Sequence, residues 1–113
     1  MNELEYLILI ELDNIKAQAV KVLDVRKLTD IADKMIVVSG TSTRHVTAIA
    51  EKLIEQLKKK GFQPNTVEGK ESAEWILIDY VDIVVHVMLP ETRKLYNLEQ
   101  LWTATQTARK DEN

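Results

Sequence analysis

The chain has 113 residues, 45% of them apolar and 29% charged, with no cysteine and a net charge of −3, which fits one domain with a single core. The small acidic excess argues against a broad basic surface that binds nucleic acid directly, and the lack of cysteine excludes disulfides, thiolate metal sites and a cysteine nucleophile. The acidic N-terminal MNELE does not suit a signal peptide, and the apolar run Tyr6–Ile10 is too short to span a membrane, so we expect a cytoplasmic protein.

The N-terminal part predicts a helix followed by two strands. Residues 3–19 follow the helical period, and their apolar stripe is wider than one packing face needs. This helix either packs only within its own domain or also packs on a second chain. Residues 20–26 and Met35–Ser39 have the composition of strands, with a polar turn at Thr29–Asp33 between them.

The clearest helix is predicted over residues 43–60. Starting at Val46, apolar residues fall at i, i+3, i+4, i+7, i+8 and i+11. A hydroxyl residue at 41–43 can cap its start, and Gly61 ends it after three lysines that suit its C-terminal dipole. The order strand, helix, strand predicts a crossover connection and helices packed on a sheet.

Two further strands are predicted at Trp75–Tyr80 and Ile83–Met88, after a loop over 62–73 with room for a short strand near Asn65–Glu68. Only two residues separate them, which favours a hairpin. One face of this hairpin is then aliphatic and predicted to be core; its members are Ile76, Ile78, Tyr80, Ile83, Val85 and Val87. The other face pairs Trp75 with Met88, Leu77 with His86, and Asp79 with Val84.

The mixed face of the hairpin suits a surface that a partner covers, although the chain's own C-terminal segment can also cover it. Pro90 and Glu91 mark the start of a helix that leads into an aromatic segment. Candidate chemistry is sparse, because the turn at Gly40–Thr43 fits neither nucleotide-binding glycine pattern and more simply caps a helix. His45 and His86 lack clustered carboxylates, so we predict no metal, cofactor or catalytic site.

Three segments carry a family resemblance: SGTSTRHV at 39–46, EGKESAEWILIDYVDIVVHVM at 68–88 and ETRKLYNLEQLW at 91–102. Together they resemble the Iojap family of bacterial ribosomal silencing factors, from about residue 5 to residue 103. The resemblance implies a single domain over 1–105, and the composition of residues 106–113 predicts a polar tail. It also implies a mixed α/β sheet of four or five strands packed with helices, similar to the nucleotidyltransferase superfamily but without its catalytic acids.

The same resemblance implies a protein without enzymatic activity. Such a protein binds the large ribosomal subunit through ribosomal protein fourteen, blocks subunit joining and represses translation when nutrients are short. Family members are often homodimers when free. The family usually has a glycine-containing turn where this chain has Tyr80-Val81-Asp82. A type I′ turn needs positive φ at both central residues, which valine resists, so the hairpin turn here either is of another type or is shifted by one residue.

The residue pattern and the resemblance together predict an apolar, acid-edged partner surface with Trp75 as its central anchor. Its predicted members are Trp75, Leu77, Asp79, His86, Met88, Tyr96, Glu99 and Trp102. Asp79 and Glu99 would pair with lysine or arginine on the partner. Two alternatives remain open: a divergent nucleotidyltransferase with Ser42 and Asp79 near a nucleotide, and a homodimeric scaffold that associates through the helix at 3–19.

Overall fold

Five strands form one mixed sheet in the computed structural model, which describes residues 2–30 and 32–96. The strands are β1 (Gln18–Asp24), β2 (Lys34–Ser39), β3 (Thr66–Glu68), β4 (Trp75–Asp79) and β5 (Ile83–Met88), and their order in space is β1-β2-β5-β4-β3. β2 and β5 are parallel, whereas the other neighbouring pairs are antiparallel. The predicted mixed α/β sheet and the short strand near 65–68 are therefore confirmed.

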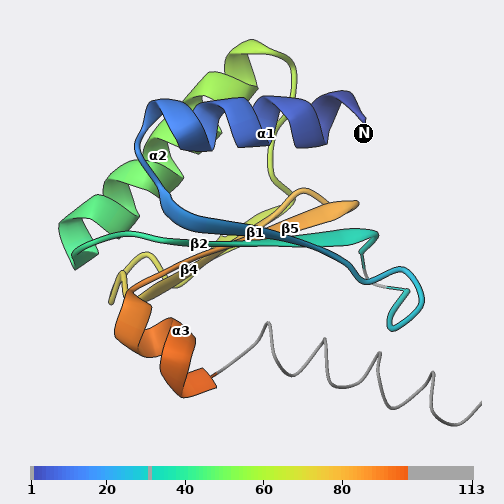
Figure 1. Ribbon diagram of the computed structural model, residues 1–113. Coiled ribbons are helices and arrows are strands. Elements are labelled where there is room, and N and C mark those ends of the chain that lie inside the picture. The colour runs from blue at the N-terminus through green and yellow to red at the C-terminus, as the bar shows by residue number, and fades with distance from the viewer. Residues whose placement is uncertain (1, 31, 97–113) are drawn as a thin grey trace, which may run out of the picture.

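Within the described residues, three helices flank the sheet. α1 (Glu3–Asn14) and α2 (Thr43–Lys59) cover one face, and the short α3 (Pro90–Tyr96) lies on the other side (Figure 1). α2 connects β2 to β3, which run in the same direction, so the predicted crossover is present. Ser42 caps α2 by accepting a hydrogen bond from the His45 backbone N–H at 3.1 Å. It is one of the three hydroxyl residues at 41–43 that the sequence offered as caps.

The first helix is shorter than its periodicity predicts. α1 ends at Asn14 rather than at residue 19, because Lys16 has a φ of 58° and the chain turns there into β1. Ile15 keeps the helical period because it still packs against the core from beyond the helix end. β1 begins at Gln18, two residues before the predicted strand at 20–26, and a bulge with Ala19 at a φ of 50° interrupts its alternation.

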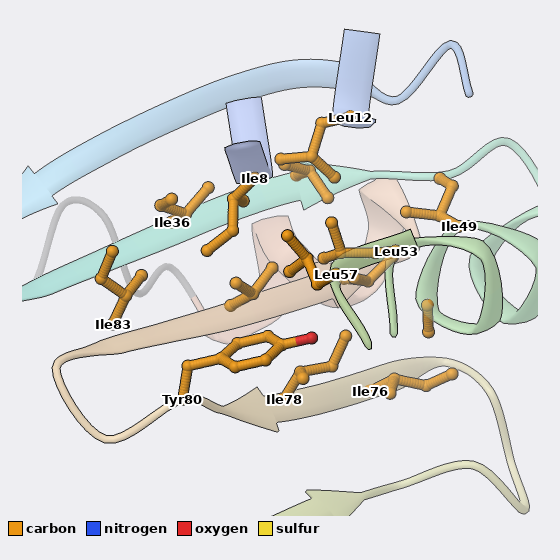
Figure 2. Packing of buried hydrophobic residues seen from close by; sticks show 14 of the residues in the cluster. Ile8, Leu12, Ile36, Ile49, Leu53, Leu57, Ile76, Ile78, Tyr80 and Ile83 are labelled. Carbon is orange, nitrogen blue, oxygen red and sulfur yellow. The ribbon is translucent and has the colours of Figure 1, made fainter. Parts of the chain in front are cut away.

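The main core lies between the sheet and the two long helices (Figure 2). Ile8 of α1 and Leu53 of α2 are fully buried there, above alternate residues of β2, β4 and β5. All six hairpin residues predicted to be core are in this cluster. Burying one large aliphatic side chain stabilises a fold by about 1.5–3 kcal/mol, so this layer dominates stability.

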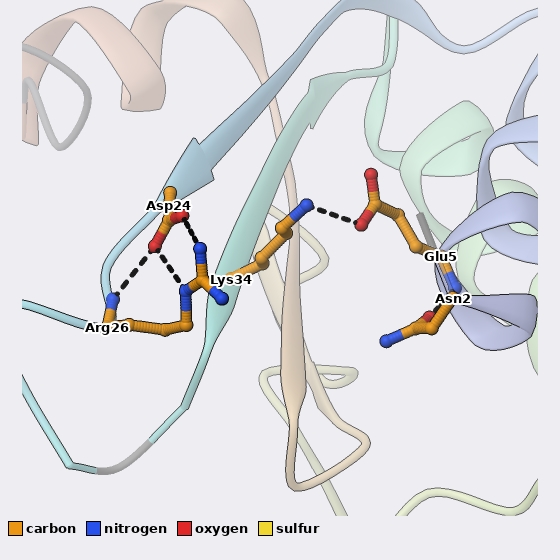
Figure 3. A network of polar contacts seen from close by, with 5 residues as sticks. All are labelled: Asn2, Glu5, Asp24, Arg26 and Lys34. Carbon is orange, nitrogen blue, oxygen red and sulfur yellow. Dashed lines mark hydrogen bonds and ion pairs between the residues drawn. The ribbon is translucent and has the colours of Figure 1, made fainter.

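Polar contacts attach α1 to the sheet (Figure 3). The side chain of Asn2 caps α1 by accepting from the Glu5 N–H at 2.7 Å, and the Glu5 carboxylate pairs with Lys34 Nζ of β2 at 2.7 Å. Glu5 is buried, so the pair with Lys34 compensates a charge that water cannot solvate. At the end of β1, Asp24 and Arg26 form a local ion pair at 2.6 Å, and this guanidinium lowers the pKa of Asp24 to about 2.

Candidate partner-binding surface

The hairpin register places the predicted partner residues on the face of the sheet that points away from α1 and α2, called here the opposite face. Trp75 lies across from Met88, Leu77 from His86, and Asp79 from Val84, as the sequence predicts. The alternate residues of β2 on this face are Met35, Val37 and Ser39. The opposite face thus combines apolar side chains with an indole, an imidazole, a hydroxyl and a carboxylate.

Burial divides the opposite face into two zones. Met88 and His86 are buried on the central strand β5, and Met88 packs in a small apolar cluster with Met35 and Val37. The three residues of β4 are half-buried, namely Trp75, Leu77 and Asp79. A partner would therefore meet the side chains of β4, while His86 and Met88 support that surface from within the chain.

The most specific contact on this face joins Trp75 to His86. The indole Nε1–H donates a hydrogen bond to His86 Nδ1 at 2.8 Å, and the two ring centroids are 5.8 Å apart with planes tilted by 49°. Burial lowers the pKa of His86 to about 4. The imidazole is therefore neutral near pH 7, and its Nδ1 lone pair is available as the acceptor for Trp75.

Asp79 has a structural contact in addition to its predicted role. One of its carboxylate oxygens accepts a hydrogen bond from the Val81 N–H at 2.7 Å. Val81 has a φ of 74°, and the Asp82 N–H bonds to the Tyr80 carbonyl at 2.9 Å, which together describe a γ-turn. The hairpin turn therefore differs from type I′ and the register is not shifted, but Val81 adopts the positive φ that valine was expected to resist.

An arginine that the sequence did not single out attaches α3 to the sheet. Arg93 Nη1 donates to Ser39 Oγ at 3.0 Å and to the Ala19 carbonyl in the β1 bulge at 2.7 Å. Leu95 lies beyond Arg93 on α3 and is 78% exposed. The sequence alone did not predict this exposure. Tyr96 is the last residue of α3, and Glu99 and Trp102 lie outside the described residues.

The residues of the enzymatic alternative are far apart in the fold. Ser42 follows the end of β2 that lies beside Met88, whereas Asp79 lies beside Val84, at the other end of β5. Ser42 caps a helix and Asp79 stabilises a turn, so each has a structural role. His45 Nδ1 accepts from the Thr41 N–H at 2.8 Å. Within residues 2–30 and 32–96, no three His, Cys, Asp or Glu side chains gather as a metal site would require.

An open groove of about 500 Å³ lies between the start of α2 and residues 70–73. Its lining mixes Arg44 and Lys70 with Glu51 and Glu71, so the charges largely balance. Neither Trp75 nor Asp79 contributes to it. Among the described helices, none has the length and apolar character needed to cross a membrane.

Comparison with known proteins identifies the family. The profile of a family described as "ribosomal silencing factor during starvation" (RsfS) matches residues 2–113. The chain belongs to this family. The ribosomal silencing factor of Haemophilus influenzae is 43% identical over 91 residues, which cover 80% of this chain and 89% of that protein. The chloroplastic protein Iojap of maize is 33% identical over 88 residues, which cover 78% of this chain and 38% of that protein.

A solved RsfS-type structure agrees with the fold. The crystal structure of a Chromobacterium violaceum protein is 42% identical and superposes with a TM-score of 0.87, over 91% of this chain and 88% of that one. The resemblance to the Iojap family is therefore confirmed. The RsfS relatives are named as silencing factors rather than as enzymes.

Proposed function

We propose that this chain silences ribosomes by binding the large subunit through the opposite face, and that it contacts ribosomal protein fourteen there. The observation that carries this proposal is the half-buried, hydrogen-bonded Trp75 on an apolar and acid-edged surface. Family membership supports the ribosome as the target, since the relatives are named ribosomal silencing factors. The proposed unit is a single cytoplasmic domain over residues 1–105.

The chemistry of the surface fits a basic protein partner. Trp75 and Leu77 offer apolar area, with the acidic Asp79 at the end of the same strand. Leu95 of α3 adds exposed apolar area on the same side of the sheet. Aromatic anchors bordered by charge are common at protein interfaces, and a net charge of −3 favours encounter with a basic surface. The surface would continue along the chain through Tyr96, Glu99 and Trp102.

The proposed action needs no chemistry at the site. A factor bound where the small subunit must dock excludes it by occupying volume, so catalytic groups are unnecessary. The separation of Ser42 from Asp79 argues against the nucleotidyltransferase alternative, which needs both residues near one nucleotide. We therefore propose a translational repressor without enzymatic activity and without a cofactor.

A subunit-joining assay tests this function. Purified large subunits are incubated with the chain, small subunits are added, and joining is followed by light scattering. We expect joining to slow in proportion to the bound chain, and crosslinking of the complex to identify ribosomal protein fourteen. The matched control is Trp75→Ala, which should leave joining unaffected at the same concentration. Normal joining on subunits saturated with the chain would contradict the proposal.

Self-association is a second candidate property, favoured by exposed apolar residues on the α1 side. Tyr6 is 57% exposed and Ile10 is 39% exposed, one turn apart on α1. Val20 and Val22 are also exposed, on the edge strand β1. We propose that these exposed residues mediate a homodimer when no ribosome is bound, which needs about 800 Å² of buried area on each partner. A monomer at high micromolar concentration in sedimentation would rule this out.

A further inference from the structure

We propose that His86 is a positioning residue that holds the Trp75 indole in the orientation required for binding a partner. This inference rests on the proposed function, because it concerns the same surface. His86 itself is buried and offers a partner almost no area. Its contribution would therefore be made through Trp75.

The geometry gives His86 control over the indole ring. Trp75 lies across from Met88, so His86 is its diagonal neighbour on the adjacent strand. The rings do not stack: they are tilted by 49°, and the indole N–H reaches Nδ1 at 2.8 Å. A tryptophan side chain has two rotatable bonds, and a hydrogen bond at the edge of its ring restrains both of them.

The acceptor is more deeply buried than the donor. His86 lies in the middle of β5, which has strand neighbours on both sides, and its side chain is 8% exposed. Trp75 is the first residue of β4 and is half-buried. Because the more exposed indole is bonded to the more deeply buried imidazole, the bond reduces the rotamer freedom that Trp75 would lose on binding. Such preorganisation improves affinity without adding a contact to the partner.

The hydrogen bond to His86 also limits which chemical groups of a partner can interact with Trp75. An indole has one donor, and here that donor already serves His86. A partner therefore meets the carbon face or edge of the ring. The chemistry that suits this face is an aliphatic side chain or the cationic end of an arginine or lysine, rather than a hydrogen-bond acceptor.

Two conservative variants of His86 test the role. In His86→Asn, the amide oxygen can take the place of Nδ1, whereas in His86→Gln the amide lies one carbon further out and cannot. Each folded variant is titrated with purified large ribosomal subunits, and the Trp75 indole N–H is followed by NMR in the free chain. The indole signal is assigned with Trp75→Phe.

We expect His86→Gln to shift the indole N–H signal, to speed its exchange with water and to weaken binding about 2- to 10-fold. His86→Asn should retain the wild-type signal and affinity. One outcome is that His86→Gln releases the indole but binds with wild-type affinity, while Trp75→Ala binds much more weakly. This outcome would overturn the role of His86 and leave the proposed function standing. Wild-type affinity of Trp75→Ala would overturn the proposed function together with this proposal. An unchanged indole signal in His86→Gln would show that the bond does not hold the ring.

Discussion

The two faces of the sheet are built differently. In the described part of the chain, the face under α1 and α2 contributes to a cluster of 17 buried apolar or small residues, whereas the opposite face has a buried cluster of four. On the first face, the Tyr80 hydroxyl is buried with no hydrogen-bond partner among the described residues. On the opposite face, His86, Ser39 and Asp79 each have one.

This difference separates two tasks. Dense apolar packing stabilises the fold but contributes little to the specificity of partner binding, because the cores of different proteins are packed in similar ways. Oriented polar groups beside half-buried aromatics contribute less to the stability of the fold and more to the specificity of partner binding. We infer that α1 and α2 supply most of the stability and that this stability allows β4 to remain partly uncovered.

The largest expected effect is on the core side. Leu53 of α2 is fully buried, and Leu53→Ala should lower the free energy of unfolding by about 2–5 kcal/mol. The matched control is Leu77→Ala on the opposite face, where the half-buried side chain should cost less than half as much. Urea denaturation of both variants measures the difference. Equal costs would show that the two faces contribute alike to stability.

The second effect concerns pH and the opposite face. The pKa of His86 is about 4 in the folded chain and has its ordinary value of 6.5 in the unfolded chain. As the pH falls, the unfolded state therefore binds the proton before the folded state does. Stability should therefore be fully present above pH 6.5 and fall as the pH drops towards 4, by up to about 3 kcal/mol. Unfolding at several pH values measures this slope, and His86→Asn should show less of it. Identical slopes would mean that His86 is not the group responsible.

The third effect concerns the turn that joins the two strands. Val81 has a φ of 74°, a conformation that costs a residue with a Cβ about 1–2 kcal/mol. Val81→Gly should recover part of this, raising the free energy of unfolding by about 1 kcal/mol after the extra entropy of unfolded glycine. Val81 belongs to neither face, so ribosome binding should not change. A destabilised Val81→Gly would indicate that the exposed valine makes a needed contact.

The smallest effect concerns the Tyr80 hydroxyl, a buried polar group without a hydrogen-bond partner among the described residues. Burial raises the pKa of Tyr80 to about 12, and its hydroxyl is unpaired among the described residues. Tyr80→Phe removes a desolvated group without leaving a cavity, so it should be neutral or stabilise by up to about 1 kcal/mol. Thermal melting measures this. A clear loss of stability would show that the hydroxyl has a partner, and the contrast between the faces would weaken.

The sequence predicts what depends on alternation and period. The register of β4 against β5 follows from the alternation of large apolar residues, and the span of α2 from its apolar spacing. The end of α1 could not be predicted, because Lys16 turns the chain through a backbone angle that leaves no mark on composition. The shifted start of β1 follows from the same turn and from the bulge at Ala19.

Contacts between distant residues were also beyond prediction. Alternation placed Trp75 and His86 on one face, but their hydrogen bond depends on side-chain rotamers. Arg93 bonds to Ala19, 74 residues away, at a carbonyl that only the bulge presents. An arginine on a short helix has the same sequence signature whether it is solvated or attached to a sheet.

The most direct test compares one aromatic residue from each side of the sheet. Trp75 is on the opposite face, and Tyr6 is exposed on α1. Each is replaced by alanine, folding is checked by thermal melting, and affinity for purified large ribosomal subunits is measured by sedimentation. We predict that Trp75→Ala weakens binding about 30- to 1,000-fold, the usual effect of losing about 2–4 kcal/mol at a central anchor, while Tyr6→Ala binds like the wild type. Normal binding by a folded Trp75→Ala, or a larger loss for Tyr6→Ala, would contradict the assignment of the opposite face as the ribosome-binding surface.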